Sequence, residues 1–138
     1  MQQLTQEILR LCREYGECRV EVERMEEARR VKNALESVCS MARQRLDISD
    51  PALLLALLDA CEVTRDEGML QEVLDVVGRN LDRLAVSVES VKLLACCYYY
   101  VEEEECAERA RRMLEELRKL GMGEEELADA ETILEELT

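Results

Sequence analysis

The chain has 138 residues, the size of one ordinary domain, and 36% of them are charged. It contains four Tyr, one Pro and five Gly, but no Phe, Trp or His. This composition is typical of helix-rich proteins and predicts an all-α fold. Because no His is present, catalytic and zinc sites that need an imidazole are excluded.

The charge of the chain argues against two classes of partner. Its 18 basic and 32 acidic residues give a net charge of −14. Such a charge repels a phosphate backbone or an anionic bilayer, so neither nucleic acid nor a membrane is expected as a partner. A basic protein or peptide is compatible with this charge, although acidic helices also serve solubility alone.

The number and spacing of the cysteines indicate the redox state of the compartment in which the protein resides. The chain has seven of them, an odd number: Cys12, Cys18, Cys39, Cys61, Cys96, Cys97 and Cys106. Their spacing shows no regular disulfide framework, which favours a reducing compartment. No charged-then-apolar leader opens the sequence, and the longest apolar stretch, 52–61, is too short to span a bilayer. The sequence therefore predicts an intracellular protein, cytoplasmic or nuclear.

Residues 1–46 allow two interpretations. Their apolar residues first recur at alternating steps of four and three, as in a heptad seam: Leu4, Ile8, Leu11, Tyr15, Cys18, Val22 and Met25. The first interpretation is one long helix that lies along the rest of the chain or forms a homodimer through this seam. The second is a set of shorter helices, with breaks near Gly16 and within 27–30. We favour the second, because 35–46 repeats the apolar spacing of 70–81.

Residues 51–137 contain three helix starts about 36 residues apart. At the first, Asp50 can cap a helix whose first residue, Pro51, needs no hydrogen-bond donor. The second start is Ser87 and the third is Gly123. These starts and the apolar spacing predict helices over 51–63, 67–84, 88–101, 103–120 and 124–137. A continuous helix over 88–120 is the alternative for two of them, because no Gly or Pro marks the corner near residue 102.

The apolar patterns also predict how these helices pack. Segments 52–61 and 93–101 are apolar on nearly every side, whereas the helices at 67–84 and 103–120 are amphipathic. We therefore expect the first helix of each hairpin to be central. The predicted architecture is one domain over 1–138, with antiparallel helical hairpins over 51–137 stacked as a short α-solenoid or a compact bundle. A long or broken N-terminal helix packs along them.

Residues 51–137 resemble a tetratricopeptide-type α-solenoid, whose packing pattern is met by Leu94, Ala95, Tyr98 and Ala107. The usual Trp, small Gly and terminal Pro of that family are absent, and the period is about 36 rather than about 34. This resemblance implies stacked hairpins that bind a peptide or protein. Segment 110–121 also resembles the second helix of a pentatricopeptide repeat, which implies binding of single-stranded RNA, but the acidic charge disfavours RNA.

Three consecutive tyrosines form the most unusual local feature of the sequence. Tyr98, Tyr99 and Tyr100 span roughly 200° of a helical wheel, so they cannot all face one core. A tyrosine at the surface is a good contact residue, because it offers a large ring and a hydroxyl. We therefore expect Tyr99 or Tyr100 to bind a partner. Burial of all three rings by neighbouring helices is the alternative.

No catalytic, cofactor or metal site is predicted. Cys96, Cys97 and Cys106 cluster but lack a Cys-x-x-Cys pair, so they are interpreted as small core residues. The acidic runs 102–105 and 124–126 lack the spacing of a calcium loop and lie where helix starts favour acids.

The predicted function is a non-catalytic protein-interaction or scaffold module, and no enzyme activity is expected. An engineered helical protein without a natural function is the alternative. The missing Phe, Trp and His favour that alternative, whereas the seven cysteines and the tyrosine triplet disfavour it.

Overall fold

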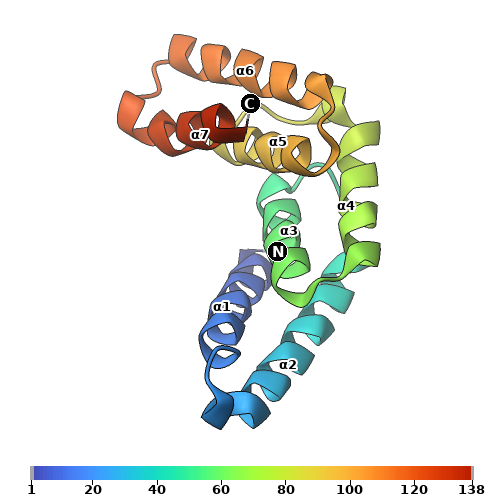
Figure 1. The fold of residues 1–138 in the computed structure, drawn as a ribbon. Helices are drawn as coiled ribbons and strands as arrows, with labels where there is room; N and C mark the ends of the chain where they lie inside the picture. Colours follow the sequence, from blue (N-terminus) through green and yellow to red (C-terminus); the bar gives the residue numbers. More distant parts are fainter. Residues whose placement is uncertain (1, 138) are drawn as a thin grey trace.

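The computed structural model describes residues 2–137, and every regular element within them is helical (Figure 1). The all-α fold predicted from the sequence is confirmed. In chain order the elements of this range are α1 (Gln2–Cys18), η1 (Val22–Arg24), α2 (Met25–Arg43), α3 (Pro51–Thr64), α4 (Glu67–Arg79), η2 (Leu81–Arg83), α5 (Val88–Val101), α6 (Glu104–Lys119) and α7 (Glu124–Leu137), where η marks a short 3-10 helix.

The N-terminal part of the chain is divided into two helices, so the single long helix is wrong. α1 ends at Cys18 and α2 begins at Met25, with η1 in the corner between them. The break expected within 27–30 is also wrong, because Glu26 and Glu27 lie in the first turn of α2, where the helix dipole favours acidic side chains. Gly16, the other expected break, lies inside the last turn of α1.

Side-chain caps begin three of the later helices. The carboxylates of Asp50 and Asp66 and the hydroxyl of Ser87 each accept a hydrogen bond from the backbone amide three residues along, at 3.3, 3.0 and 3.1 Å. α4 ends at Arg79 rather than near residue 84, because the Asn80 side chain donates to the Val76 carbonyl at 2.7 Å and stops the helix. The predicted starts of α3, α4 and α5 therefore follow from local capping, whereas α6 begins after Glu103 without a side-chain cap.

The corner after α5 separates α5 from α6, so the continuous helix over 88–120 is wrong. Glu102 adopts the left-handed conformation, with φ of 52°, and its amide donates to the Tyr98 carbonyl at 2.7 Å. Arg65 ends α3 in the same way, with φ of 59°. At the end of α6, Gly121 takes φ of 92°, as expected of a helix terminator.

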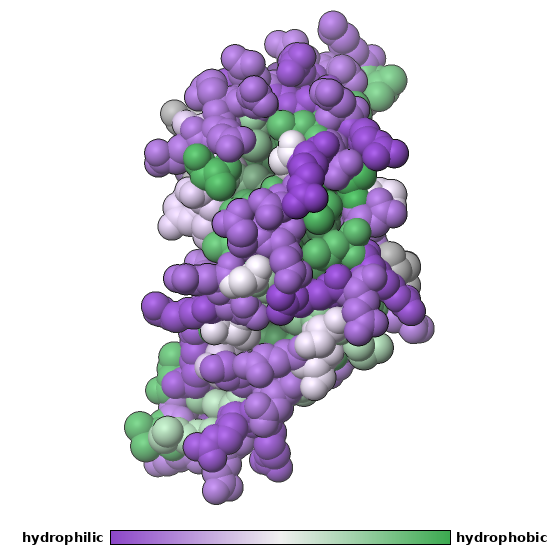
Figure 2. Space-filling model, turned by 90° about the vertical axis from the view of Figure 1, so that its right-hand side faces the viewer, coloured by the Kyte–Doolittle hydropathy of each residue, from purple (hydrophilic) through white to green (hydrophobic). Residues whose placement is uncertain are grey.

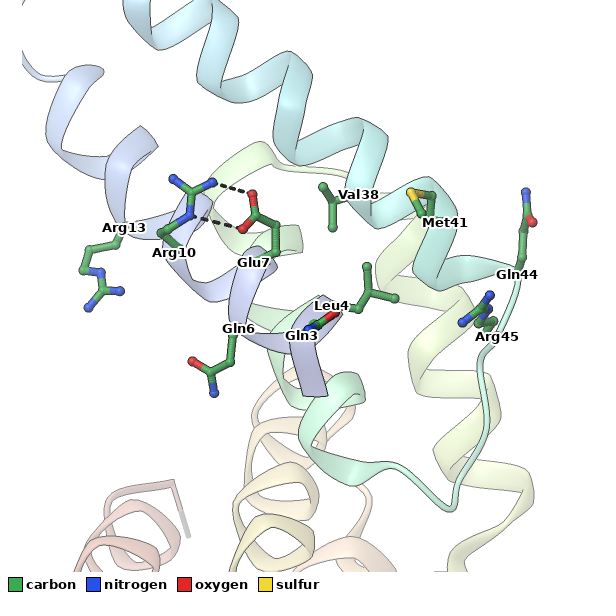
Figure 3. Close-up of a pocket in the computed structure, with 10 residues that line it drawn as sticks. All are labelled: Gln3, Leu4, Gln6, Glu7, Arg10, Arg13, Val38, Met41, Gln44 and Arg45. Carbon is green, nitrogen blue, oxygen red and sulfur yellow. Dashed lines mark hydrogen bonds and ion pairs between the residues drawn. The ribbon is translucent and has the colours of Figure 1, made fainter. Parts of the chain in front are cut away.

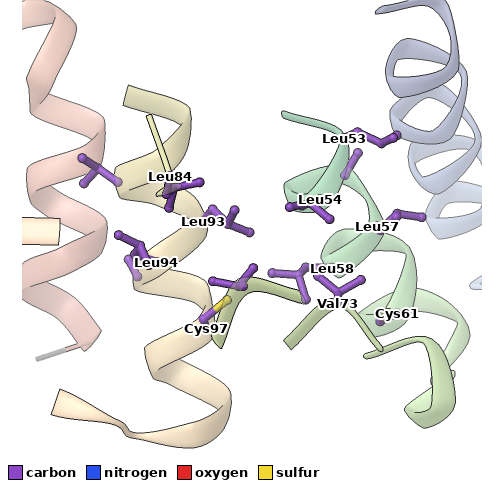
Figure 4. Packing of buried hydrophobic residues seen from close by; sticks show 14 of the residues in the cluster. Leu53, Leu54, Leu57, Leu58, Cys61, Val73, Leu84, Leu93, Leu94 and Cys97 are labelled. Carbon is purple, nitrogen blue, oxygen red and sulfur yellow. The ribbon is translucent and has the colours of Figure 1, made fainter. Parts of the chain in front are cut away.

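The helices pack around two central ones. α1 lies against α2, and α5 lies against α6 (Figure 1). α3 contacts both α1 and α5, while α5 also contacts α7. Leu54 and Leu58 of α3 face Leu93 of α5 (Figure 4), and all three side chains are buried. One continuous cluster of buried apolar residues therefore connects the N-terminal helices to the C-terminal one.

The heptad seam of α1 is part of this core. Ile8 is fully buried, and Leu11 and Cys18 are nearly so. Val22 and Met25 are instead 83% and 59% exposed, because they lie in the corner before α2 and at its start. Most of the seam within α1 therefore packs in the core, whereas the last two residues of the seam lie exposed at the corner before α2. The buried side chains of the seam, Ile8, Leu11 and Cys18, are not available to the homodimer interface considered above, and the homodimer itself stays a prediction.

Candidate functional site

The three tyrosines lie in the last turn of α5 and differ in exposure. Tyr98 and Tyr100 are half-buried and pack against the core, whereas Tyr99 is 61% exposed. The rings of Tyr99 and Tyr100 meet edge to face, with their centroids 5.1 Å apart. The Tyr99 ring is therefore presented to solvent in a defined orientation.

Two shallow hollows adjoin Tyr99 and Tyr100. One, of about 330 Å³, lies towards the start of α4, and the other, of about 230 Å³, lies along α3. Their charged lining consists of four carboxylates and one guanidinium: Asp59, Glu62, Asp66, Glu67 and Arg65. We call these five residues, together with Tyr99 and Tyr100, the tyrosine surface. On this surface two aromatic rings lie beside mainly acidic side chains.

Most of these carboxylates lack a basic partner. Asp66 lies 3.6 Å from the guanidinium of Arg43, but within residues 2–137 no ion pair involves Asp59, Glu62 or Glu67. Partial burial raises the pKa of Asp59, and the nearby charge of Glu62 raises it further. Three of the four carboxylates of this surface therefore have no ion-pair partner within the described chain.

The hydroxyl of Tyr100 stays protonated at neutral pH. Burial raises the pKa of Tyr100 to about 12, with a further contribution from the charge of Glu62. The hydroxyl can then donate as well as accept a hydrogen bond. The tyrosine surface thus offers aromatic rings, a hydroxyl and carboxylates, which are groups suited to binding rather than to nucleophilic attack.

Known proteins do not identify the chain. No family model, curated protein or solved structure matches it. The resemblance to tetratricopeptide modules stays a prediction. The remaining arguments on function rest on the surfaces of the molecule itself.

Burial disfavours ionisation of the seven cysteine thiols. All seven are free, and six of them are buried. The expected group at 96, 97 and 106 is joined by a second one, Cys12, Cys39 and Cys61, whose members influence each other's ionisation across three helices. Burial raises the pKa of Cys12 to about 11 and that of Cys39 and Cys61 to about 12, so thiolates are scarce at neutral pH. No sequence spacing indicates this second group, because tertiary packing brings it together.

Within residues 2–137 no three Cys, Asp or Glu side chains are placed to hold a metal ion. In the same range, none of the helices combines the length and the apolar character needed to cross a bilayer. Glu104 and Glu105 of the first acidic run lie in the first turn of α6, and the run 124–126 lies in the first turn of α7, as their interpretation predicted. The face on the side of α4 is mainly hydrophilic, with small separate apolar patches (Figure 2).

Proposed function

We propose that this chain is a non-catalytic protein-interaction module that binds a basic segment of a partner protein at its tyrosine surface. The observation that carries the proposal is the Tyr99 ring. It is 61% exposed, it is oriented by its edge-to-face contact with Tyr100, and it lies beside carboxylates that have no basic partner in the described chain.

Both components of the tyrosine surface favour a basic partner. A tyrosine ring buries a large area on binding and loses little conformational freedom. A Lys or Arg of the partner that lies over the exposed face of Tyr99 would contribute about 0.5–1 kcal/mol. The unpaired carboxylates of Asp59 and Glu62 would attract the same cation and speed its association. A bound cation would also lower the pKa of Asp59, which the folded chain holds raised.

The experiment measures the affinity of the full chain for two labelled amphipathic helical peptides of about 16 residues. They share the same Leu and Ala positions, and differ only in carrying Lys (the basic peptide) or Glu (the acidic peptide) elsewhere. Fluorescence anisotropy at low salt should show that Tyr99→Ser weakens binding of the basic peptide about tenfold, as expected for the loss of a central aromatic contact.

The matched control is Val20→Ser, which removes another exposed apolar side chain, on the corner between α1 and α2. It should leave the affinity for the basic peptide unchanged, and thermal melts of both variants should match the parent. Unchanged affinity in Tyr99→Ser, or an equal loss in Val20→Ser, would contradict the proposal.

A further inference from the structure

α1 and α2 leave a solvent-open groove between them, with a volume of about 1030 Å³ (Figure 3). α1 lines it with residues between Gln3 and Arg13, and α2 and its C-terminal end line it with residues between Val38 and Arg45. At 1.5 Å per residue, the α1 side is about 15 Å long, or about three helical turns. The groove is therefore long enough to contact three turns of another helix.

The middle of the groove is apolar. Leu4 of α1 and Val38 and Met41 of α2 point into the space between the two helices (Figure 3). Leu4 and Val38 are half-buried and pack against the core, so their positions are fixed. Met41 is 60% exposed, and its flexible thioether can adapt to an apolar surface laid against it.

The charged lining of the groove is basic in an acidic chain. It contains three guanidiniums, those of Arg10, Arg13 and Arg45, and a single carboxylate, that of Glu7. Arg10 is already paired with Glu7 and also lies 2.6 Å from a carboxylate oxygen of Glu14. Arg13 and Arg45 are exposed, and neither forms an ion pair within residues 2–137. Two guanidiniums without an ion-pair partner thus lie at the edges of the groove, Arg13 on the outer side of α1 and Arg45 just after α2 (Figure 3).

We propose that this groove binds an amphipathic helix of a partner protein, with carboxylates flanking its apolar face. The apolar side chains of such a helix, spaced one turn apart, would contact Leu4, Val38 and Met41. Its carboxylates would accept charge-assisted hydrogen bonds from the free guanidiniums of Arg13 and Arg45. The inference does not depend on the tyrosine surface, which is acidic and lies on α3, α4 and α5.

A second copy of this chain is a poorer occupant. Its most acidic helix, α7, has only acidic charged residues, which would suit the arginines of the groove. However, Leu127, Ala130 and Leu134 of α7 are buried in the core of their own chain. A second copy therefore cannot present apolar anchors from that helix, which favours a partner of different sequence.

The test uses the acidic and basic peptides on the full-length chain. At low salt the acidic peptide should bind the parent, and the Arg13→Glu, Arg45→Glu double variant should bind it at least tenfold more weakly. The matched control is the Arg29→Glu, Arg112→Glu double variant. It changes the net charge equally, at two exposed arginines that lie outside the groove and form no ion pair in the described chain. It should change the affinity less than threefold.

Three results would overturn the inference. The first is no binding of the acidic peptide to the parent, and the second is a loss of affinity for it in the control double variant as large as that in the Arg13→Glu, Arg45→Glu variant. The third is a loss of affinity for the acidic peptide in Tyr99→Ser but not in the Arg13→Glu, Arg45→Glu variant. The first two results would leave the proposed function of the tyrosine surface standing, whereas the last would place the acidic peptide at that surface. Light scattering over a concentration series adds a further check. A dimer that the Arg13→Glu, Arg45→Glu variant abolishes would mean that a second copy fills the groove, which contradicts the inference.

Discussion

The tyrosine surface and the groove between α1 and α2 differ in both charge and shape, although they belong to one acidic chain. Carboxylates without basic partners surround the exposed Tyr99 ring, whereas two unpaired guanidiniums flank the apolar middle of the groove. The net charge of −14 indicates one kind of partner, a basic one. The local arrangement indicates a basic partner at one surface and an acidic one at the other. Net charge alone is therefore a poor guide to what each surface binds.

The two surfaces are supported by one hydrophobic core, so a cavity in that core should destabilise the fold that positions both of them. Leu57 is fully buried in α3 and points towards α1 (Figure 4), on the opposite side from α5. Leu57→Ala should lower the free energy of unfolding by about 2–5 kcal/mol, because it leaves a cavity between packed helices. Urea denaturation followed by circular dichroism measures this change.

The control for that prediction is Leu120→Ala, at a leucine that is 80% exposed. It should change the free energy of unfolding by less than about 0.5 kcal/mol. A loss below about 1 kcal/mol in Leu57→Ala would mean that the contact between α3 and α1 does not hold the groove in place.

The second prediction concerns pH and the helices beneath the groove. Burial raises the pKa of Cys39 and Cys61 to about 12, above the ordinary thiol value of 9.0. Above pH 9 the unfolded chain therefore loses thiol protons that the folded chain retains, so stability falls as the pH rises. The loss should be about 1.4 kcal/mol per pH unit for each thiol.

Urea denaturation at a series of alkaline pH values tests this prediction. The Cys39→Ala, Cys61→Ala double variant should show a shallower fall in stability than the parent over the same range, because two of the groups with raised pKa values are absent. Parallel curves for the two proteins would show that these thiols keep ordinary pKa values in the folded chain.

The third and smallest prediction compares backbone strain in two corners, the one after α5 beside the tyrosine surface and the one after α1 that joins the two helices of the groove. In residues 2–137, only Arg65 and Glu102 are non-glycine residues with positive φ, and Glu102 follows the tyrosine helix α5. Glu102→Gly removes a strain of about 1–2 kcal/mol and adds chain entropy to the unfolded state. We expect a net gain of up to about 1 kcal/mol in the free energy of unfolding, measured by urea denaturation.

Val20→Gly is the matched change in the corner after α1, where no residue has positive φ. It should not stabilise the chain, because glycine relieves no strain there and only adds unfolded-state entropy. Equal gains in both variants would mean that the left-handed conformation of Glu102 is not strained.

Local signals predicted much of the fold. The starts of α3, α4 and α5 follow from capping by Asp50, Asp66 and Ser87, which act within one turn of their own position. The end of α5 could not be predicted in this way, because a glutamate at residue 102 carries no sequence mark of a left-handed corner. The angular span of three helical positions predicted that at least one ring would be exposed, but tertiary packing decided that it is Tyr99 rather than Tyr100.

The groove could not be predicted from the sequence. The periodicity of α1 identifies its apolar stripe, but not which edge of that stripe the neighbouring helix leaves uncovered. Leu4 begins the seam, yet it lies half-buried at the groove, while Ile8 of the same seam is fully buried. Arg13 and Arg45 are distant in sequence, and the packing of α1 on α2 brings them to the same groove.

The most direct test of two surfaces with opposite preferences is a crossed affinity measurement. Both peptides are titrated against the parent, Tyr99→Ser and the Arg13→Glu, Arg45→Glu variant. The predicted result is a crossed pattern: Tyr99→Ser loses the basic peptide and keeps the acidic one, while the arginine variant loses the acidic peptide and keeps the basic one. If either variant lost both peptides to the same extent, with its melting curve unchanged, the two surfaces would not be independent binding sites.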